Sequence, residues 1–405
     1  MTQLDERPVG APTVRRPTGR RPRTREQIIR RRRLFAIGVL AAGIFVIWLA
    51  VSLGFALTNP ALGTSFSSRF AEWARENGGG SLVNWVEKEW YSHHQPPVGG
   101  KPPNGEITRV HGGATAPVTS SVSHLPAPAA IAPFASPAVP GEGQWSAAGR
   151  LVHGLPAIYE TRLRPDAVHT SEVVGIAWMD TKLLKATLYS GSQIPGGGPF
   201  THTAPVQPTA ANSLVAAFNA GFLLSGSNGG YYTDGRTVAP LRQGAASFVI
   251  DKNGDVTLGQ WGRDVSMSAN VVSVRQNLNL LVDNGQPVPS VSNANSSAWG
   301  ATLGGGLDVW RSGVGETLNG ALVYVGGPAL NISTLADLLV RAGAVRAMEL
   351  DINTDWVNLA TFAPPAGTSA ASATDGVDLL PTMAGAPGRY FATWWARDFF
   401  TMSAR

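Results

Sequence analysis

The chain has 405 residues, no cysteine and a formal net charge of +5. The absence of cysteine excludes disulfide bonds, thiolate metal sites and a cysteine nucleophile. The charge is uneven, because residues 1–33 carry eleven arginines and three acidic residues, a net +8, which leaves −3 for the remainder. A mildly acidic remainder gives no electrostatic support for a nucleic-acid partner, and we expect none.

An uncharged segment of 24 residues, Leu34 to Leu57, follows the basic tail formed by residues 1–33. A helix of that length reaches ~36 Å, which exceeds the bilayer hydrocarbon core of about 30 Å. Arginines beside a span stay in the cytoplasm. The sequence therefore predicts a single-pass membrane protein that contacts lipid through residues 34–57, with an extracytoplasmic C-terminal part. Gly54-Phe55-Ala56 leaves cleavage as a signal sequence open.

Two segments of different composition separate this span from the rest of the chain. In residues 58–94, apolar side chains recur at spacings of three and four, with an interruption at Gly78-Gly79-Gly80. This pattern predicts a juxtamembrane stalk of two short amphipathic helices, packed on the membrane surface or on the domain that follows. Residues 95–144 are rich in Pro, Ala and Gly, and predict an extended linker that holds the domain off the bilayer.

Residues 145–405 form the predicted extracytoplasmic domain, in which short β-type runs are separated by turn dipeptides. Asp234-Gly235, Asn253-Gly254 and Asn284-Gly285 are typical of tight hairpins. A helix is expected from Ser333, as N-cap, to Gly343. The predicted fold class is α+β, a large mixed β-sheet domain with few helices. The strands are expected at Val173–Trp178, Lys185–Tyr189, Leu214–Phe218, Ala246–Ile250, Val271–Val274, Leu278–Val282, Ala321–Val325 and Ala347–Leu350.

Polar residues of possible chemical use follow or precede several of these strands. Asn219 ends a buried strand, and Arg242 and Arg311 lie in loops where a guanidinium can meet an anion. Glu349 and Asp351 are two positions apart, so in a strand they would share a face and influence each other's pKa values. Taken singly, these residues are better explained by turns, surface ion pairs and solvated carboxylates. Isolated histidines give no reason to expect a metal site, and no cofactor is identified.

Taken in order, three segments resemble the phosphodiester glycosidase family over roughly residues 210–400. Asn219 to Leu223 resembles the family's N-G-G-F-F, Arg311 to Gly315 its R-T-A-[IV]-G, and Ala347 to Thr354 its A-x-N-L-D-G-G-G-S. The sequence departs from the family where Ile352 to Asp355 replaces Gly-Gly-Gly-Ser, and where Glu349 replaces Asn. Three glycines that would let the backbone approach a ligand closely are therefore missing.

The resemblance implies hydrolysis of a sugar-1-phosphodiester, here one of the cell envelope. It implies that Arg311, together with Arg242, holds the phosphate, and that Asp351 or Glu349 activates water or stabilises an oxocarbenium-like centre. Asn219 would orient the sugar, with Asn353 as a further substrate-binding residue. The missing glycines favour the alternative, a non-catalytic domain of the same fold that binds envelope glycans.

Overall fold

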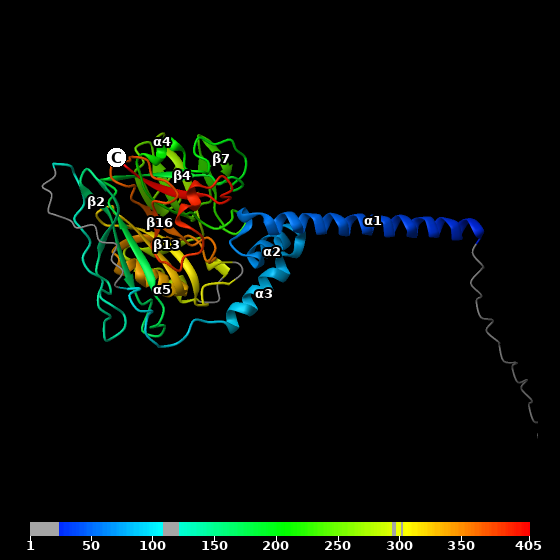
Figure 1. Ribbon diagram of the computed structural model, residues 1–405, viewed down its shortest axis with the longest axis horizontal. Helices are drawn as coiled ribbons and strands as arrows, with labels where there is room; N and C mark the ends of the chain where they lie inside the picture. Colours follow the sequence, from blue (N-terminus) through cyan, green and yellow to red (C-terminus); the bar gives the residue numbers. More distant parts are fainter. Residues whose placement is uncertain (1–23, 108–120, 294–296, 301–302) are drawn as a thin grey trace, which may run out of the picture. The chain divides into compact units, whose positions relative to one another are not determined.

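The computed structural model describes residues 24–107, 121–293, 297–300 and 303–405 (Figure 1). Predictions for most of the basic tail and for the middle of the linker lie outside the described residues. The chain divides into two compact units, Met1–Phe55 and Ala56–Arg405.

The first unit consists, in its described part, of most of helix α1, Arg25–Thr58. Among the described residues, this is the one helix that is long and apolar enough to cross a membrane, and a signal sequence would pass the same test. The helix is longer than the predicted span because the arginine-rich flank from Arg25 onward continues it.

The stalk residues form two helices, as predicted, and belong to the second unit. Ser65 caps α2 by accepting a hydrogen bond from Ser68 N at 3.1 Å. The helices separate where Gly78 adopts a φ of 87°, a conformation that glycine reaches without steric cost. The elements are η1 (Pro60–Leu62), α2 (Phe66–Ala74), the distorted turn η2 (Arg75–Gly79) and α3 (Gly80–His93).

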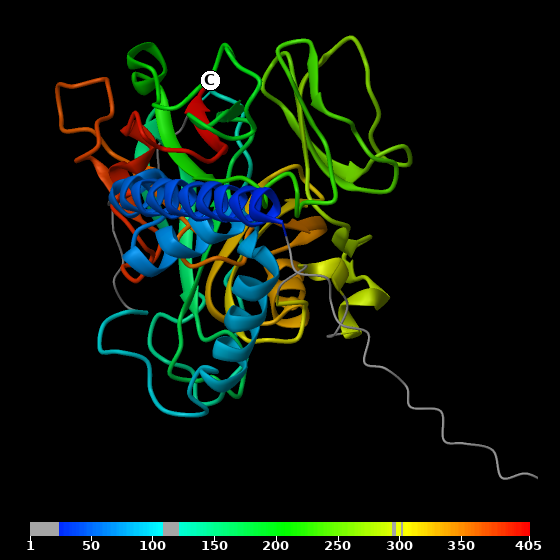
Figure 2. The same cartoon turned by 90° about the vertical axis from the view of Figure 1, so that its right-hand side faces the viewer.

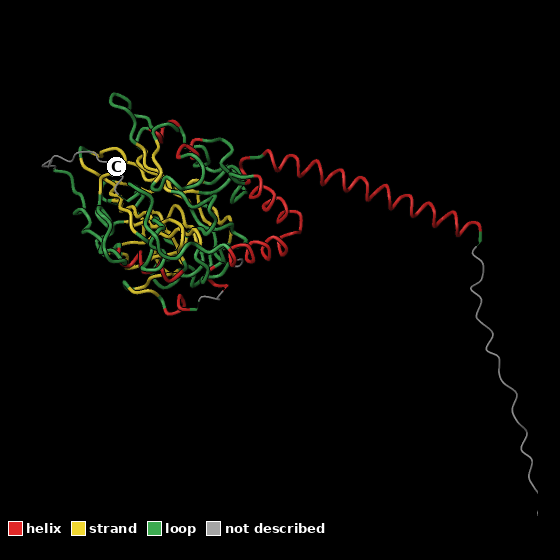
Figure 3. The backbone as a smooth tube through the Cα atoms, turned by 60° about the horizontal axis from the view of Figure 1, so that its bottom comes forward, coloured by secondary structure: helices red, strands yellow, loops and turns green. Residues whose placement is uncertain are grey.

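Three antiparallel sheets make up the rest of this unit, and helices are few (Figure 3). The predicted α+β class is confirmed, with pairs between named strands all antiparallel within the described residues. The large sheet has the order β1 (Ser146–Val152), β2 (Leu155–Leu163), β3 (Val174–Met179), β14 (Leu322–Leu330), β13 (Val309–Thr317), β15 (Ala344–Glu349), β11 (Leu280–Asp283) and β12 (Gln286–Pro287).

The two smaller sheets have five strands each. The second sheet has the order β17 (Gly376–Asp378), β16 (Leu359–Phe362), β5 (Leu214–Asn219), β18 (Phe399–Ala404) and β4 (Leu184–Tyr189). The hairpin sheet, light green in Figure 2, has the order β7 (Arg236–Ala239), β6 (Tyr231–Thr233), β10 (Val271–Gln276), β8 (Ala246–Asp251) and β9 (Val256–Gln260). The remaining elements are α4 (Pro208–Ala211), α5 (Ile332–Arg341), η3 (Pro289–Ser292), η4 (Ser297–Trp299) and η5 (Pro387–Phe391).

Strand alternation gives the large sheet two different buried faces. Ile176 of β3 packs in a cluster with Leu335 of α5, whereas its neighbour Ala177 packs in a cluster with Phe218 of β5. Because successive side chains of a strand point to opposite faces, α5 covers one face and the second sheet covers the other. The end of β5 and the residues after β15 meet at β13, where Ser312 bonds to both Asn219 and Asp351.

Local turn and cap chemistry follows the sequence closely, with one correction. The predicted hairpin dipeptides connect β6 to β7, β8 to β9 and β11 to β12, and Gly235, Gly254 and Gly285 each have positive φ. The predicted N-cap of α5 was wrong. Asn331 caps the helix by accepting from Thr334 N at 2.9 Å, because α5 begins at Ile332, before Ser333.

The described parts of the Pro-rich segment 95–144 pack on the domain instead of forming a free spacer. Ile107 and Ile131 are buried, and Leu125 N donates to the Asp180 carboxylate at 2.7 Å. Glu142 forms a buried ion pair with Arg164 at 2.8 Å. Scattered apolar residues and one buried carboxylate anchor a segment whose composition predicted an extended chain.

Candidate active site

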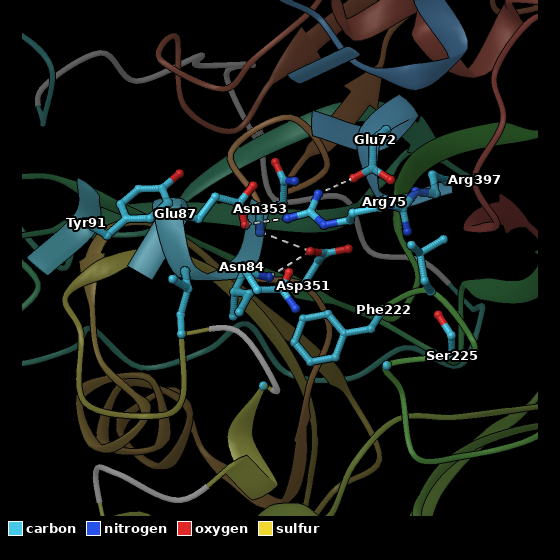
Figure 4. A pocket seen from close by; sticks show the side chains of 15 residues that line it. Glu72, Arg75, Asn84, Glu87, Tyr91, Phe222, Ser225, Asp351, Asn353 and Arg397 are labelled. Atoms are coloured by element: carbon cyan, nitrogen blue, oxygen red, sulfur yellow. Dashed lines mark hydrogen bonds and ion pairs between the residues drawn. The ribbon is translucent and has the colours of Figure 1, made fainter. Parts of the chain in front are cut away.

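A cavity of about 300 Å³ lies where the domain meets the stalk (Figure 4). Its domain wall comes from the segments after β5 and β15, from the segment before β18 and from the loop before β13. Its other wall comes from α2, η2 and α3. The lining residues are Glu72, Arg75, Asn84, Glu87, Tyr91, Phe222, Leu223, Ser225, Gly226, Gly300, Leu303, Asp351, Ile352, Asn353 and Arg397.

Asp351 places a carboxylate on the cavity wall in a fixed orientation. Its Oδ1 accepts hydrogen bonds from Ile352 N at 2.8 Å and Asn353 N at 3.0 Å. Burial raises the pKa of Asp351 to about 6, against the lowering effect of Arg397 and these two backbone donors, while Glu72 raises it further. At neutral pH the group is therefore mainly ionised, with a basicity suited to accepting a proton from water.

Arg397 supplies a guanidinium on the same wall. The residue is only 8 % exposed, and its guanidinium lies over the Trp356 ring, 4.5 Å from the centroid. Within the part of the chain that the structure describes, its side chain has no hydrogen-bond or ion-pair partner. Because buried charges are normally paired, an unpaired guanidinium at a cavity is suited to binding an anion.

Arg311 and Glu349 pair with each other and are absent from the cavity wall. Both are fully buried, with Arg311 Nη1 2.6 Å from Glu349 Oε1. Arg311 also donates from Nε to Leu330 O and from Nη2 to Gly304 O, each at 2.8 Å. Burial raises the pKa of Glu349 to about 7, although Arg311 acts in the opposite direction. With its donors used internally, this arginine is not placed to hold a phosphate.

The separation of Glu349 from Asp351 has a simple geometric cause. We expected the two carboxylates to share a strand face, but β15 ends at Glu349. Asp351 lies two residues beyond the end of the strand, where the backbone still bonds to Ser312 but the two-residue alternation no longer applies. One carboxylate therefore points into the protein and the other lines the cavity.

Asn219 lies one hydrogen-bond layer behind Asp351. Its Nδ2 donates to Ser312 Oγ at 3.1 Å, and its Oδ1 accepts from Tyr324 Oη at 2.9 Å and Asn358 N at 3.2 Å. Ser312 Oγ in turn accepts from Asp351 N at 3.2 Å. Asn219 thus joins the second sheet to the large sheet beneath the cavity and does not line it.

The two remaining predicted residues differ in their placement. Asn353 lines the cavity, and its Oδ1 accepts from Asp355 N at 2.9 Å, which stabilises the turn after Asp351. Arg242 is exposed and donates to Asn228 Oδ1 at 2.6 Å, and it is not among the lining residues. The cavity therefore brings together Asp351 and Asn353, with Asn219 behind them.

The stalk contributes a wall that the sequence did not predict. Arg75 forms ion pairs with Glu72, at 2.8 Å, and with Glu87. The Thr64 hydroxyl donates to the Asp355 carboxylate and holds the start of the stalk beside the turn after Asp351. Of the two locations we considered for the stalk, the membrane surface and the domain, the structure shows the domain. In Figure 4 Arg75 lies between the two stalk glutamates at the cavity.

Three further polar residues, Arg275, Asn277 and Asp398, support the loop after β5. Arg275 and Asp398 form a fully buried ion pair at 2.6 Å. Asn277 Oδ1 accepts from Phe222 N at 3.1 Å, and a Cβ at Gly221 would lie only 2.8 Å from that oxygen. The glycine of the first family-like motif is thus required by packing against Asn277.

Among the described residues, no group of three or more His, Cys, Asp or Glu side chains could hold a metal ion.

Comparison with known proteins identifies a family over the segment that ends at Asp351. The model of the phosphodiester glycosidase family matches residues 212–351. Among solved structures, the catalytic domain of zebrafish N-acetylglucosamine-1-phosphodiester alpha-N-acetylglucosaminidase, auto-inhibited by its pro-peptide, is matched with 15% identity, 65% of this chain, 88% of that chain and a TM-score of 0.40.

Two bacterial structures also match. A protein from Synechocystis is matched with 13% identity, 62% of this chain, 63% of that chain and a TM-score of 0.34. A protein from Burkholderia pseudomallei is matched with 13% identity, 59% of this chain, 75% of that chain and a TM-score of 0.31. No curated protein matches the chain. The predicted resemblance to the phosphodiester glycosidases is confirmed by the family model over residues 212–351.

Proposed function

We propose that this protein is a hydrolase of a sugar-1-phosphodiester. The supporting observation is that a fixed carboxylate, Asp351, and an unpaired buried guanidinium, Arg397, line one cavity. The match to the phosphodiester glycosidase model supports the reaction class, and it includes Asp351. A phosphodiester is anionic, so Arg397 complements the group that must be bound.

In the proposed reaction, Arg397 binds the non-bridging phosphate oxygens and places the anomeric carbon near Asp351. Asp351 accepts a proton from a water molecule, whose oxygen forms a bond to the anomeric carbon. The bond between that carbon and the bridging oxygen breaks, and both of its electrons leave with the phosphate monoester. Since the leaving group carries its charge on phosphate, little acid assistance is needed. The products are a free sugar and a phosphate monoester.

The other predicted residues take supporting roles in this proposal. Asn353 holds the turn that orients Asp351 and is available to a sugar hydroxyl. Asn219 and Glu349 are positioning residues, because each acts on the strand end that carries Asp351. Arg311 is paired with Glu349 in the interior, so in this proposal Arg397 binds the phosphate instead.

The experiment measures hydrolysis of the methyl ester of α-N-acetylglucosamine 1-phosphate by the full-length chain. Asp351→Asn should lower kcat/KM by about 10²–10⁴-fold, the range for loss of a general base. Arg397→Met should lower kcat/KM by about 10²–10³-fold, as for loss of one charge-stabilising donor. The control is Arg242→Met, an exposed arginine away from the cavity, which should retain activity. In ¹⁸O-labelled water the label should enter the sugar.

Two results would reject the hydrolase. Label in the phosphate product would show cleavage at phosphorus, and full activity of both variants would remove the assigned site. Tight binding of the diester without any product would instead favour the glycan-binding alternative, which the sequence Ile352 to Asp355 after Asp351 also supports.

We also propose that α1 anchors the protein through residues 34–57, with the basic tail in the cytoplasm and residues 58–405 outside. The length and composition of the helix and the eleven arginines before its apolar part support this orientation. The substrate would then belong to the cell envelope. Digestion of the domain by protease added outside intact cells would support this orientation, and protection of the domain there would contradict it.

A further inference from the structure

A larger cavity of about 850 Å³ opens beside the candidate active site, between the stalk and the turn after Asp351. Its volume falls within the range of about 300–1,000 Å³ typical of small-molecule sites. The stalk side of this cavity is mainly apolar, and its apolar side chains include Phe70, Leu82, Val86 and Trp90. We call this cavity the apolar groove.

The apolar groove adjoins the polar cavity. Glu72, Arg75, Glu87, Tyr91 and Asn353 line both, so the two spaces share one wall. A ligand that places an anionic group beside Arg397 would reach the groove by passing the ion-paired side chain of Arg75. The two ends of such a ligand must differ in chemistry, since one space offers charges and the other hydrocarbon.

Three of the groove side chains are about half exposed. Phe70 is 49 % exposed, Val86 49 % and Trp90 59 %. Apolar surface of this extent beside a polar site is typical of a binding surface. In the sequence, these helices directly follow the apolar helix α1, so an apolar occupant would be available from the lipid phase if α1 spans the membrane.

On the basis of the proposed function, we infer that the substrate is a lipid-linked glycosyl phosphodiester. The sugar and phosphate occupy the polar cavity, and the hydrocarbon chain on the second phosphate oxygen occupies the apolar groove. A methyl ester offers nothing to the groove, whereas a long chain gains free energy by leaving water for it.

The test compares the methyl and farnesyl esters of α-N-acetylglucosamine 1-phosphate, with the full-length chain in phosphatidylcholine vesicles. The farnesyl ester should have the higher kcat/KM by about tenfold or more. Phe70→Ser should lower the farnesyl-to-methyl ratio by about tenfold. Phe66→Ser is the matched control, since Phe66 lies on the same helix, is 70 % exposed and does not line the groove.

Each outcome decides a separate point. Equal kcat/KM for the two esters would overturn the lipid assignment while leaving the hydrolase intact. An equal fall in the ratio for Phe66→Ser and Phe70→Ser would show docking of the stalk on the vesicle surface and would also overturn it.

If neither ester is hydrolysed, the proposed reaction fails, and binding of farnesyl phosphate then tests the groove alone. Weaker binding by Phe70→Ser than by Phe66→Ser would support the groove in that case. Equal affinities of both variants and the unmodified chain would reject it.

Discussion

The strand ends at this site carry two arginines with opposite surroundings. Arg311, on β13, is fully buried and donates to Glu349 and to backbone carbonyls. Arg397, before β18, is nearly as buried but stacks on Trp356 and leaves its donors to the cavity. The carboxylates differ in the same way, because Glu349 faces its arginine and Asp351 faces open space. Burial alone therefore does not distinguish a structural charge from a binding group, whereas unused hydrogen-bonding capacity does.

The largest expected difference between the two arginines is in stability. Arg311→Met leaves Glu349 buried without its partner, and should lower the free energy of unfolding by about 3–5 kcal/mol. Arg397→Met keeps an aliphatic stem on Trp356, so the free energy of unfolding should change by less than about 1 kcal/mol. Denaturant unfolding of the two variants measures both values. Equal losses of stability would show that the two arginines have the same role.

The pH dependence separates the two carboxylates. Because the pKa of Asp351 is raised to about 6, kcat/KM should fall as the pH is lowered through about 6, where the base becomes protonated. Stability should change in the opposite direction. A carboxyl whose folded pKa exceeds its ordinary value near 4 favours folding at low pH, and this contribution is lost as the pH rises from about 4 to 6.

The control for this pH dependence is Glu349→Gln. The pKa of Glu349 is raised to about 7, but its side chain does not line the cavity. The variant should therefore keep the fall in kcat/KM below about pH 6. This is measured in buffers of constant ionic strength. Loss of that fall would assign the essential ionisation to Glu349.

The smallest expected effect is at Ser312, which links Asn219 to the backbone of Asp351. Ser312→Ala removes buried neutral hydrogen bonds and should cost about 1–2 kcal/mol of stability. Turnover should also fall, because the turn that carries Asp351 loses one attachment. Ser333→Ala, on α5, removes a hydrogen bond to Val291 O and should leave turnover unchanged. Equal turnover of both variants would contradict the positioning role of Asn219 and Ser312.

Local sequence patterns predicted much of the fold and only part of the site. Hairpin dipeptides and apolar runs identified the strands, because both depend on neighbouring residues. We expected Arg311 and Glu349 to contact the substrate, but the structure pairs them with each other inside the protein. Since β15 ends at Glu349, the carboxylate that reaches the cavity is that of Asp351. Arg397 could not be placed from the sequence, since its position depends on packing against Trp356.

The stalk helices also show that local sequence patterns do not specify contacts between distant segments. Apolar spacing predicted the two helices and their break at the glycines, but the pattern did not specify which surface would receive them. Contacts such as the one between Thr64 and Asp355 join residues that are remote in the sequence. The cavity therefore contains a wall that no local motif indicates.

The packing of residues 95–144 has a practical consequence for producing the domain as a soluble fragment. A fragment starting at residue 145, the domain boundary expected from composition, would discard Glu142 and leave Arg164 without its buried carboxylate. It would also discard the stalk helices, and with them one wall of the cavity. A fragment starting at Asn59, after α1, retains both, and is the shortest form in which we expect substrate recognition to be studied without detergent.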